Sequence, residues 1–214
     1  LMLPFRLMDA ADTTEALARV QDVKFALDQI LSSEHAAAFD NQTIVMAGHS
    51  YGANTSMLLS GAQVEQNGSL VSLKDDRIKA AILISAPPFY NNQPLDKVLA
   101  EVKIPTLHIT TTEDEIRVPG FYSSPQDRFG LYNAMASSYK VLAVFSSGSH
   151  NIFSGWRGAK DTKPKQQVIK AATQALSSAF IAQITTDDSR AISLWAQQHQ
   201  AVLAKFIRSD NLGV

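Results

Sequence analysis

The sequence contains no cysteine, and this absence excludes a disulfide-stabilised fold, a thiolate nucleophile and zinc sites built on cysteine. It also carries no His-Glu-x-x-His motif and no pair of histidines at the spacing of metal ligands. Neither of the glycine-rich fingerprints of nucleotide-binding folds is present. We therefore expect a protein that works without a metal and without a cofactor.

Long apolar runs and clusters of like charge are also missing. No apolar run approaches the ~20 residues that a membrane-spanning helix needs. The 19 basic and 20 acidic residues are scattered and leave a net charge of -1, so there is no basic patch for nucleic acid. We expect neither a membrane span nor nucleic-acid binding. The composition leaves the compartment open between the cytoplasm and a periplasmic or secreted location.

The 214 residues, 45% of them hydrophobic and 18% charged, are enough for one α/β domain with a sizeable core over residues 1–214. Short apolar runs alternate with longer segments of helical periodicity, which predicts an α/β fold with a mostly parallel sheet and helices on both faces. The expected strands cover residues 43–47, 77–85, 106–110 and 140–145. The expected helices cover residues 13–31, 94–102, 127–138, 164–184 and 188–207, with one more from the turn after Ser50 to about Val64.

The segment Gly48-His49-Ser50-Tyr51-Gly52 lies between the strand-like run at residues 43–47 and a helix-like run. A serine with a glycine two positions to either side, in this context, is typical of a nucleophile elbow. We expect that a side chain at either glycine would collide where the strand and the helix approach each other. The motif predicts that the Ser50 hydroxyl is exposed at the carboxyl end of a strand, ready to attack a carbonyl carbon.

A serine hydroxyl becomes a good nucleophile only when a base accepts its proton, and a carboxylate orients that base. His150, alone among the five histidines, lies in a Gly/Ser loop directly after a strand end and is the candidate base. An acidic run follows the strand at residues 106–110, and within it Asp114 is the first choice for the acid and Glu113 the alternative. The chain order serine, acid, histidine is the one found on α/β-hydrolase scaffolds.

Two other histidines lie close to these elements. His108 lies inside an apolar strand, and we interpret it as a core residue. His49 precedes Ser50 at a tight turn that directs its side chain away from the serine. We expect His49 to pack against a loop or to orient it.

Three segments carry a resemblance to a known superfamily: Gly48-His49-Ser50-Tyr51-Gly52-Ala53, then Ile104-Pro105-Thr106-Leu107-His108-Ile109 before Asp114, and then Gly148-Ser149-His150. The chain from about Arg19 to Phe153 resembles the α/β-hydrolase superfamily, and within it the dienelactone hydrolase-like and platelet-activating-factor acetylhydrolase-like serine esterases. The resemblance implies Ser50 as nucleophile, Asp114 as acid and His150 as base. Dienelactone hydrolases proper usually carry a cysteine at the nucleophile position, and Ser50 favours ordinary ester cleavage instead.

These features predict a serine hydrolase that cleaves small carboxylic esters with short acyl chains through an acyl-enzyme on Ser50. A peptidase or a thioesterase would use the same triad, and a non-catalytic binding protein of this fold is the alternative from a different class. Aromatic residues follow several strand ends, where such sheets bind ligands, so we expect an apolar substrate pocket there. The predicted lining residues are Phe89, Tyr90, Phe121 and Trp156.

An acyl-transfer site needs preorganised donors for the developing oxyanion. We expect one donor to be the main-chain N–H of Tyr51, while the second in this fold comes from a loop after an earlier strand. No convincing strand precedes Thr43, so we hypothesise that the chain is the carboxyl-terminal portion of a longer hydrolase. A companion N-terminal segment or another chain would then complete the sheet and cover the edge of the strand at residues 43–47.

Overall fold

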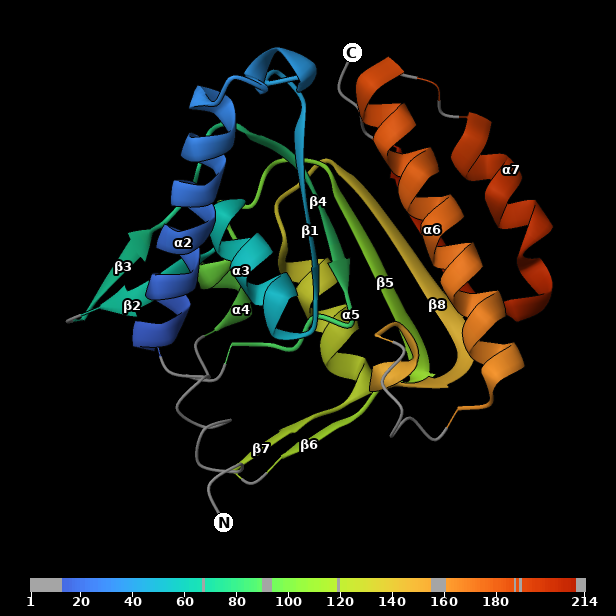
Figure 1. Ribbon diagram of the computed structural model, residues 1–214. Helices are drawn as coiled ribbons and strands as arrows, with labels where there is room; N and C mark the ends of the chain where they lie inside the picture. Colours follow the sequence, from blue (N-terminus) through green and yellow to red (C-terminus); the bar gives the residue numbers. More distant parts are fainter. Residues whose placement is uncertain are drawn as a thin grey trace.

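The computed structural model describes residues 13–66, 68–89, 94–118, 120–154, 161–186, 188 and 190–210. Its main feature is a five-stranded sheet in the order β1-β4-β5-β8-β9, in which the first four strands run parallel and β9 runs antiparallel (Figure 1). The strands of this sheet are β1 (Ile44–His49), β4 (Ile78–Ile84), β5 (Thr106–Glu113), β8 (Tyr139–Ser149) and β9 (Leu203–Asp210). Two small hairpins accompany it, β2 (Gln63–Gln66) with β3 (Ser69–Ser72) and β6 (Ile116–Val118) with β7 (Phe121–Ser123).

Helices cover both faces of the sheet, which confirms the predicted fold class (Figure 1). One face packs against α2 (Thr13–Ser32), α3 (Tyr51–Leu59), α4 (Leu95–Val98) and α5 (Pro125–Ala134). The other face packs against α6 (Lys163–Thr186) and α7 (Arg190–Gln198). In the described part of the chain, no helix has both the length and the apolar character that crossing a membrane requires.

The strand β4 shows why the central strands have apolar residues at successive positions and do not alternate between apolar and polar residues. Successive residues of a strand point to opposite faces of the sheet. Ala81 and Leu83 pack in the core with α3 and α4, whereas Ala80 and Ile82 pack in the core with α6 and α7. Because both faces of β4 are buried, apolar residues occupy both sets of positions.

The strand β1 differs from β4 because it forms an edge of the sheet. Among the described strands, only β4 pairs with it. Five of its six residues are partly exposed and Ala47 is exposed, while most of β4 is buried. Between residues 13 and 43 the described structure contains α2 and the short 3-10 helix η1 (Ala36–Ala38), and no strand. That a companion segment or chain covers this edge stays a prediction.

The helix α3 ends earlier than predicted. We expected it to run to about Val64, but it ends at Leu59 and Val64 lies in β2. Gly61 explains the difference, because its φ of +120° is a left-handed conformation and a Cβ there would collide with the Glu101 carbonyl. The turn predicted at residues 66–69 is the connection between β2 and β3.

The predicted helix over residues 188–207 is wrong in its second half. The helix α7 ends at Gln198, and after the 3-10 helix η3 (Gln200–Val202) the strand β9 pairs with the outer edge of β8. Phe206 packs in the core with α6, whereas Ile207 packs against α5 and β8 on the opposite face. This alternation suits a strand, and the hydrogen bonds that β8 offers outweigh the local helical pattern.

Candidate active site

Ser50 lies on a sharp turn between β1 and α3. Its φ of 55° is a value that residues with a side chain rarely adopt, so the turn is strained. As expected, a Cβ at Gly48 would collide with the carbonyl of Gly52, because the strand and the helix come so close. The same expectation is wrong for Gly52, where a Cβ would meet no described atom within 4 Å. The Ser50 N–H donates to the Ile84 carbonyl at 2.9 Å, which ties the turn to β4.

His150 follows the end of β8 and begins the short 3-10 helix η2 (His150–Ile152). Its Nε2 lies 2.7 Å from the Oγ of Ser50, although 100 positions separate the two residues in the sequence. The strand β8 is longer than predicted and extends to Ser149, whose N–H and hydroxyl donate to the Asp161 carboxylate at 3.1 and 2.6 Å. This anchor holds the end of the strand, and thereby the histidine, beside the serine.

Asp114 is the acidic residue that reaches His150. Its Oδ1 lies 2.7 Å from the Nδ1 of His150, and its Oδ2 accepts a hydrogen bond from the Thr110 hydroxyl at 2.6 Å. The Asp114 side chain is 0% exposed, whereas Glu113, the alternative acid, is exposed. Hydrogen bonds therefore connect Ser50, His150 and Asp114 in one chain.

These bonds decide which ring nitrogen of His150 carries the proton. In the neutral ring, Nδ1–H donates to Asp114 and leaves Nε2 to accept from the Ser50 hydroxyl. Burial by itself would raise the pKa of Asp114, but the hydrogen bond from His150 and the charge of Arg128 outweigh it and hold this pKa well below its usual range. The arrangement can thus move a proton from serine to histidine beside an ionised carboxylate.

His49 packs directly against His150. The two rings are stacked with their centroids 4.9 Å apart, and the His49 Nε2 lies 3.0 Å from the main-chain carbonyl of His150. Burial, and then the charge of His150, lowers the pKa of His49, so its ring is neutral and its Nε2–H donates to that carbonyl. These contacts match the expectation that His49 orients a loop, and the loop is the one that carries His150.

Arg128, in α5, is a residue of this site that the sequence analysis missed. Its guanidinium is 3% exposed, and its Nη2 and Nε donate to the two carboxylate oxygens of Asp114 at 3.1 and 3.4 Å. The two residues are 14 positions apart, and the β6–β7 hairpin lies between them in the sequence. No sequence pattern marks such a pair, because only the packing of α5 against β5 brings the two groups together.

Tyr51 is the first residue of α3, at the end of the helix where the dipole favours a negative charge. Its main-chain N–H directly follows Ser50, and the guanidinium of Arg19 in α2 lies 4.7 Å from the centre of its ring. The function of this N–H as an oxyanion donor stays a prediction.

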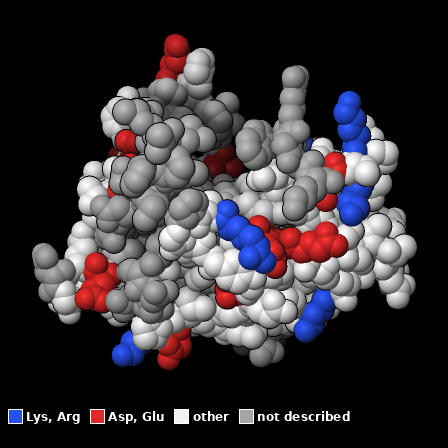
Figure 2. Space-filling model, turned by 90° about the horizontal axis from the view of Figure 1, so that it is seen from below, with Lys and Arg blue, Asp and Glu red and all other residues white. Residues whose placement is uncertain are grey.

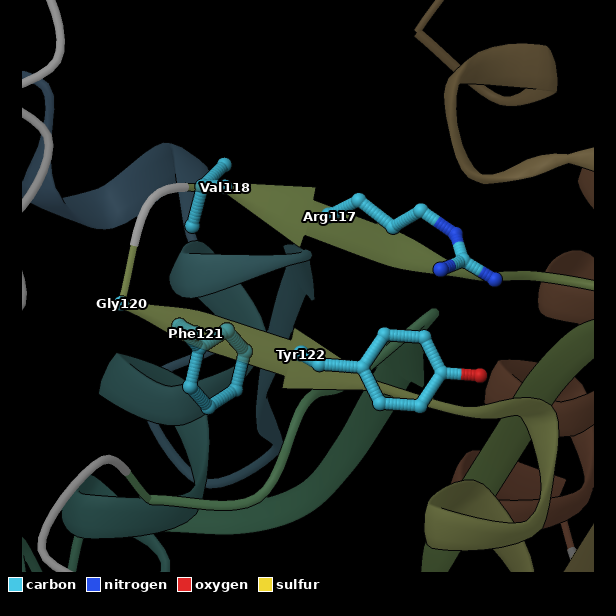
Figure 3. Close-up of a pocket in the computed structure, with 5 residues that line it drawn as sticks. All are labelled: Arg117, Val118, Gly120, Phe121 and Tyr122. Atoms are coloured by element: carbon cyan, nitrogen blue, oxygen red, sulfur yellow. The ribbon is translucent and has the colours of Figure 1, made fainter.

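The predicted pocket residues lie in different places. Tyr90 and Trp156 lie outside the described residues. Phe89 is partly buried and packs against the apolar core on the α3 side of the sheet. Phe121 lies in β7 and lines a pocket of about 450 Å³ on the β6–β7 hairpin (Figure 3). The other residues that line this pocket are Arg117, Val118, Gly120 and Tyr122.

The β6–β7 hairpin, which the sequence analysis did not predict, connects Asp114 to α5. The side chains of Arg117 and Tyr122 extend side by side (Figure 3), with the guanidinium 4.8 Å from the centre of the ring. Both contact the carboxylate of Glu115, at 2.8 Å from Arg117 Nη2 and 3.2 Å from the Tyr122 hydroxyl. Figure 2 looks from below onto the carboxyl edge of the sheet, where described acidic and basic side chains lie next to each other. The described part of this face is therefore mixed in charge.

No family model and no curated protein matches this sequence. Among solved structures, the acylaminoacyl peptidase of Pyrococcus horikoshii is similar, with a TM-score of 0.50 and 16% sequence identity over 77% of this chain and 27% of that chain. The chain has the α/β-hydrolase fold. A cold-adapted esterase from an Arctic intertidal metagenomic library is also similar, with a TM-score of 0.48 and 19% identity over 78% of this chain and 59% of that chain. The chain thus spans less than two thirds of the length of either protein.

Proposed function

We propose that this chain carries the reacting groups of a serine hydrolase. The observation that supports this proposal is the chain of two hydrogen bonds, 2.7 Å from Ser50 Oγ to His150 Nε2 and 2.7 Å from His150 Nδ1 to Asp114 Oδ1. A strained serine at a strand-to-helix turn supports it as well, since such a turn presents the hydroxyl to a bound substrate. A binding protein would have no need for a serine, a base and an acid in this order.

The proposed reaction has two steps. In the first, Ser50 Oγ attacks the carbonyl carbon while its proton passes to Nε2 of His150, and the Tyr51 N–H stabilises the oxyanion. His150 then gives the proton to the leaving oxygen, the bond to that oxygen breaks, and an acyl-enzyme on Ser50 remains. In the second step His150 takes a proton from water and the hydroxide attacks the acyl carbon. The bond between that carbon and Ser50 Oγ then breaks, His150 returns its proton to Ser50 Oγ, and the carboxylic acid is released.

We propose small carboxylic esters with short acyl chains as the substrates. A serine nucleophile and the resemblance to dienelactone hydrolase-like and platelet-activating-factor acetylhydrolase-like esterases support this class. Phe121 on the hairpin, with Phe89, Tyr90 and Trp156 after other strand ends, would supply the apolar lining. A peptidase is the second candidate, favoured by the likeness of fold to the Pyrococcus horikoshii acylaminoacyl peptidase.

The test uses a fluorophosphonate probe on the wild-type protein, Ser50→Ala and Ser69→Ala, the last being a matched control at an exposed serine of β3. We expect labelling of the wild type and the control and none of Ser50→Ala. The same three proteins are assayed with p-nitrophenyl esters of increasing acyl length and with an acylaminoacyl p-nitroanilide. Esters should be cleaved faster, and cleavage should fall with acyl length. A wild-type protein that is neither labelled nor active would instead support a non-catalytic binding protein.

A further inference from the structure

The carboxylate of Asp114 is shared between two partners of different kinds, the imidazole of His150 and the guanidinium of Arg128. Its Oδ1 accepts hydrogen bonds from His150 Nδ1 at 2.7 Å and from Arg128 Nη2 at 3.1 Å. Its Oδ2 accepts from the Thr110 hydroxyl at 2.6 Å and, more weakly, from Arg128 Nε at 3.4 Å. Four donors thus surround a carboxylate that is 0% exposed, and water is not needed to complete its hydrogen bonds.

The guanidinium of Arg128 is itself held in a defined orientation. Its Nη1 donates to the Ser123 hydroxyl and to the Ser124 carbonyl, the latter at 3.1 Å. Ser124 begins α5 through a capping box with Asp127, whose carboxylate also accepts from the Ser123 hydroxyl at 2.9 Å. The start of the helix therefore aims the guanidinium at Asp114, and a flexible ammonium group could not reproduce its planar fork.

If no other group offset its charge, a buried carboxylate would stabilise a protonated histidine beside it with its whole negative charge. Here the positive charge of Arg128 offsets the negative charge of Asp114 before His150 accepts a proton. The imidazolium that forms during the reaction is therefore stabilised less than it would be by an unshared carboxylate, and it gives up its proton more readily to the leaving group.

We propose that Arg128 is a positioning residue of this site, which holds the Asp114 carboxylate toward His150 and limits how strongly that carboxylate stabilises the protonated ring. The effect of Arg128 on catalysis rests on the proposed serine hydrolase function. Its electrostatic part concerns only the protonation of His150 and can be measured without turnover.

Other titratable groups also face this cluster. His49, from β1, stacks on His150, and Glu113, from β5, accepts from the main chain of the His150 loop at Gly148. Asp161 accepts from Ser149, and Asp127 is linked to Arg128 through Ser123 and Ser124. None of these groups bonds Asp114 in the described structure, where His150 and Arg128 are the titratable residues that donate to its carboxylate.

The experiment follows the His150 ring by NMR during a pH titration and records kcat/KM against pH for the wild type, Arg128→Gln and Arg128→Lys. Without the guanidinium charge the imidazolium is stabilised more, so Arg128→Gln should move the midpoint of the His150 titration, and the acid limb of kcat/KM, to higher pH by about one unit. Arg128→Lys keeps the charge without the fork and should move both by less. A purely structural contribution would lower kcat/KM at every pH and leave both midpoints in place.

Arg77→Gln is the matched control, because Arg77 forms ion pairs with Asp75 and Asp28 at 2.6 and 2.5 Å outside this cluster. It should leave the His150 midpoint unchanged. If Arg128→Gln does not fold, Arg128→Met, which also removes the positive charge, decides the question by the same readout. An unchanged midpoint in the folded variants overturns the Arg128 proposal even if the wild type is labelled by fluorophosphonate. An unlabelled wild type with a shifted midpoint overturns the hydrolase function and supports the electrostatic part of the Arg128 proposal.

Discussion

Two histidines, one in β5 and one directly after the neighbouring strand β8, have opposite surroundings. His108 lies in the middle of β5 and is 4% exposed, with its Nε2 3.1 Å from the Thr106 hydroxyl and its ring edge-on to Tyr132. His150 lies beyond the end of β8, between a buried carboxylate and a serine hydroxyl. Burial, and then the charge of Lys140, lowers the pKa of His108 to about 3. Burial without an acidic partner thus yields a ring that is neutral at neutral pH, whereas a bonded carboxylate can support a base.

The position of each histidine along its strand explains this difference. In the sheet, His108 is in register with Leu83 on β4 and Leu142 on β8, and both neighbours are buried and apolar. A carboxylate in their place would be buried among apolar side chains, at a large cost in free energy. At the carboxyl edge the strands give way to loops, where polar side chains from several elements can meet. Chemistry is therefore possible at the edge of this sheet and excluded from its centre.

The strongest test of the comparison removes each ring in turn. His150→Ala should lower kcat for ester hydrolysis by roughly 10⁴-fold or more, because Ser50 loses the group that accepts its proton. His108→Gln should keep kcat within about twofold, since no proton passes through it. Initial rates with a p-nitrophenyl ester, after circular dichroism has shown that both variants are folded, measure the difference. Similar losses in the two variants would contradict the contrast between edge and centre.

A weaker effect is expected at His49, which packs against His150 and has no part in the proposed proton transfer. His49→Phe keeps an aromatic ring stacked on His150 but removes the hydrogen bond to its carbonyl. The loop should then hold His150 less accurately, and kcat should fall by about tenfold. Steady-state kinetics measures this, with His199→Phe, stacked on Trp195, as the matched ring substitution. A loss as large as that of His150→Ala would mean that His49 takes part in the reaction itself.

The smallest effect on activity, and a distinct effect on stability, is expected at His108. Its pKa is about 3 in the folded protein against about 6.5 when unfolded, so the unfolded chain binds the proton first as pH falls. The contribution of the neutral ring is complete above about pH 6.5 and is lost progressively toward pH 3. The wild type should lose about 2 to 3 kcal/mol of unfolding free energy between pH 6.5 and 4.5 relative to His108→Gln. Urea unfolding at the two pH values measures this, and parallel losses in both proteins would refute it.

Several features were predictable because they depend on neighbours in the sequence. The strands β4, β5 and β8 appear as short apolar runs, since burial on both faces demands apolar residues throughout. Ser50 was recognisable because a sharp strand-to-helix turn leaves a local pattern of small residues around it. His150 was recognisable because it follows a strand end, and all parallel strands end at one edge of the sheet.

Other features depend on contacts that leave no local pattern. The segment after Gln198 has helical periodicity, yet it forms β9 because the edge of β8 provides hydrogen-bond partners. Whether Asp114 or Glu113 faces the histidine depends on the direction of two adjacent side chains at the end of β5, which sequence alone left open. The hairpin β6–β7 and the arginine that follows it were not expected at all.

The sequence by itself thus determined the class of the fold, the strained serine and the histidine that can serve it, because each depends on the residues beside it in the chain. Only the tertiary structure decided which carboxylate meets that histidine, that Arg128 shares this carboxylate, and that β9 pairs with β8 as the outer strand of the sheet. The physical reason is that buried charges and strand edges are satisfied by whichever groups lie nearest in space, and proximity in space is a property of the folded chain.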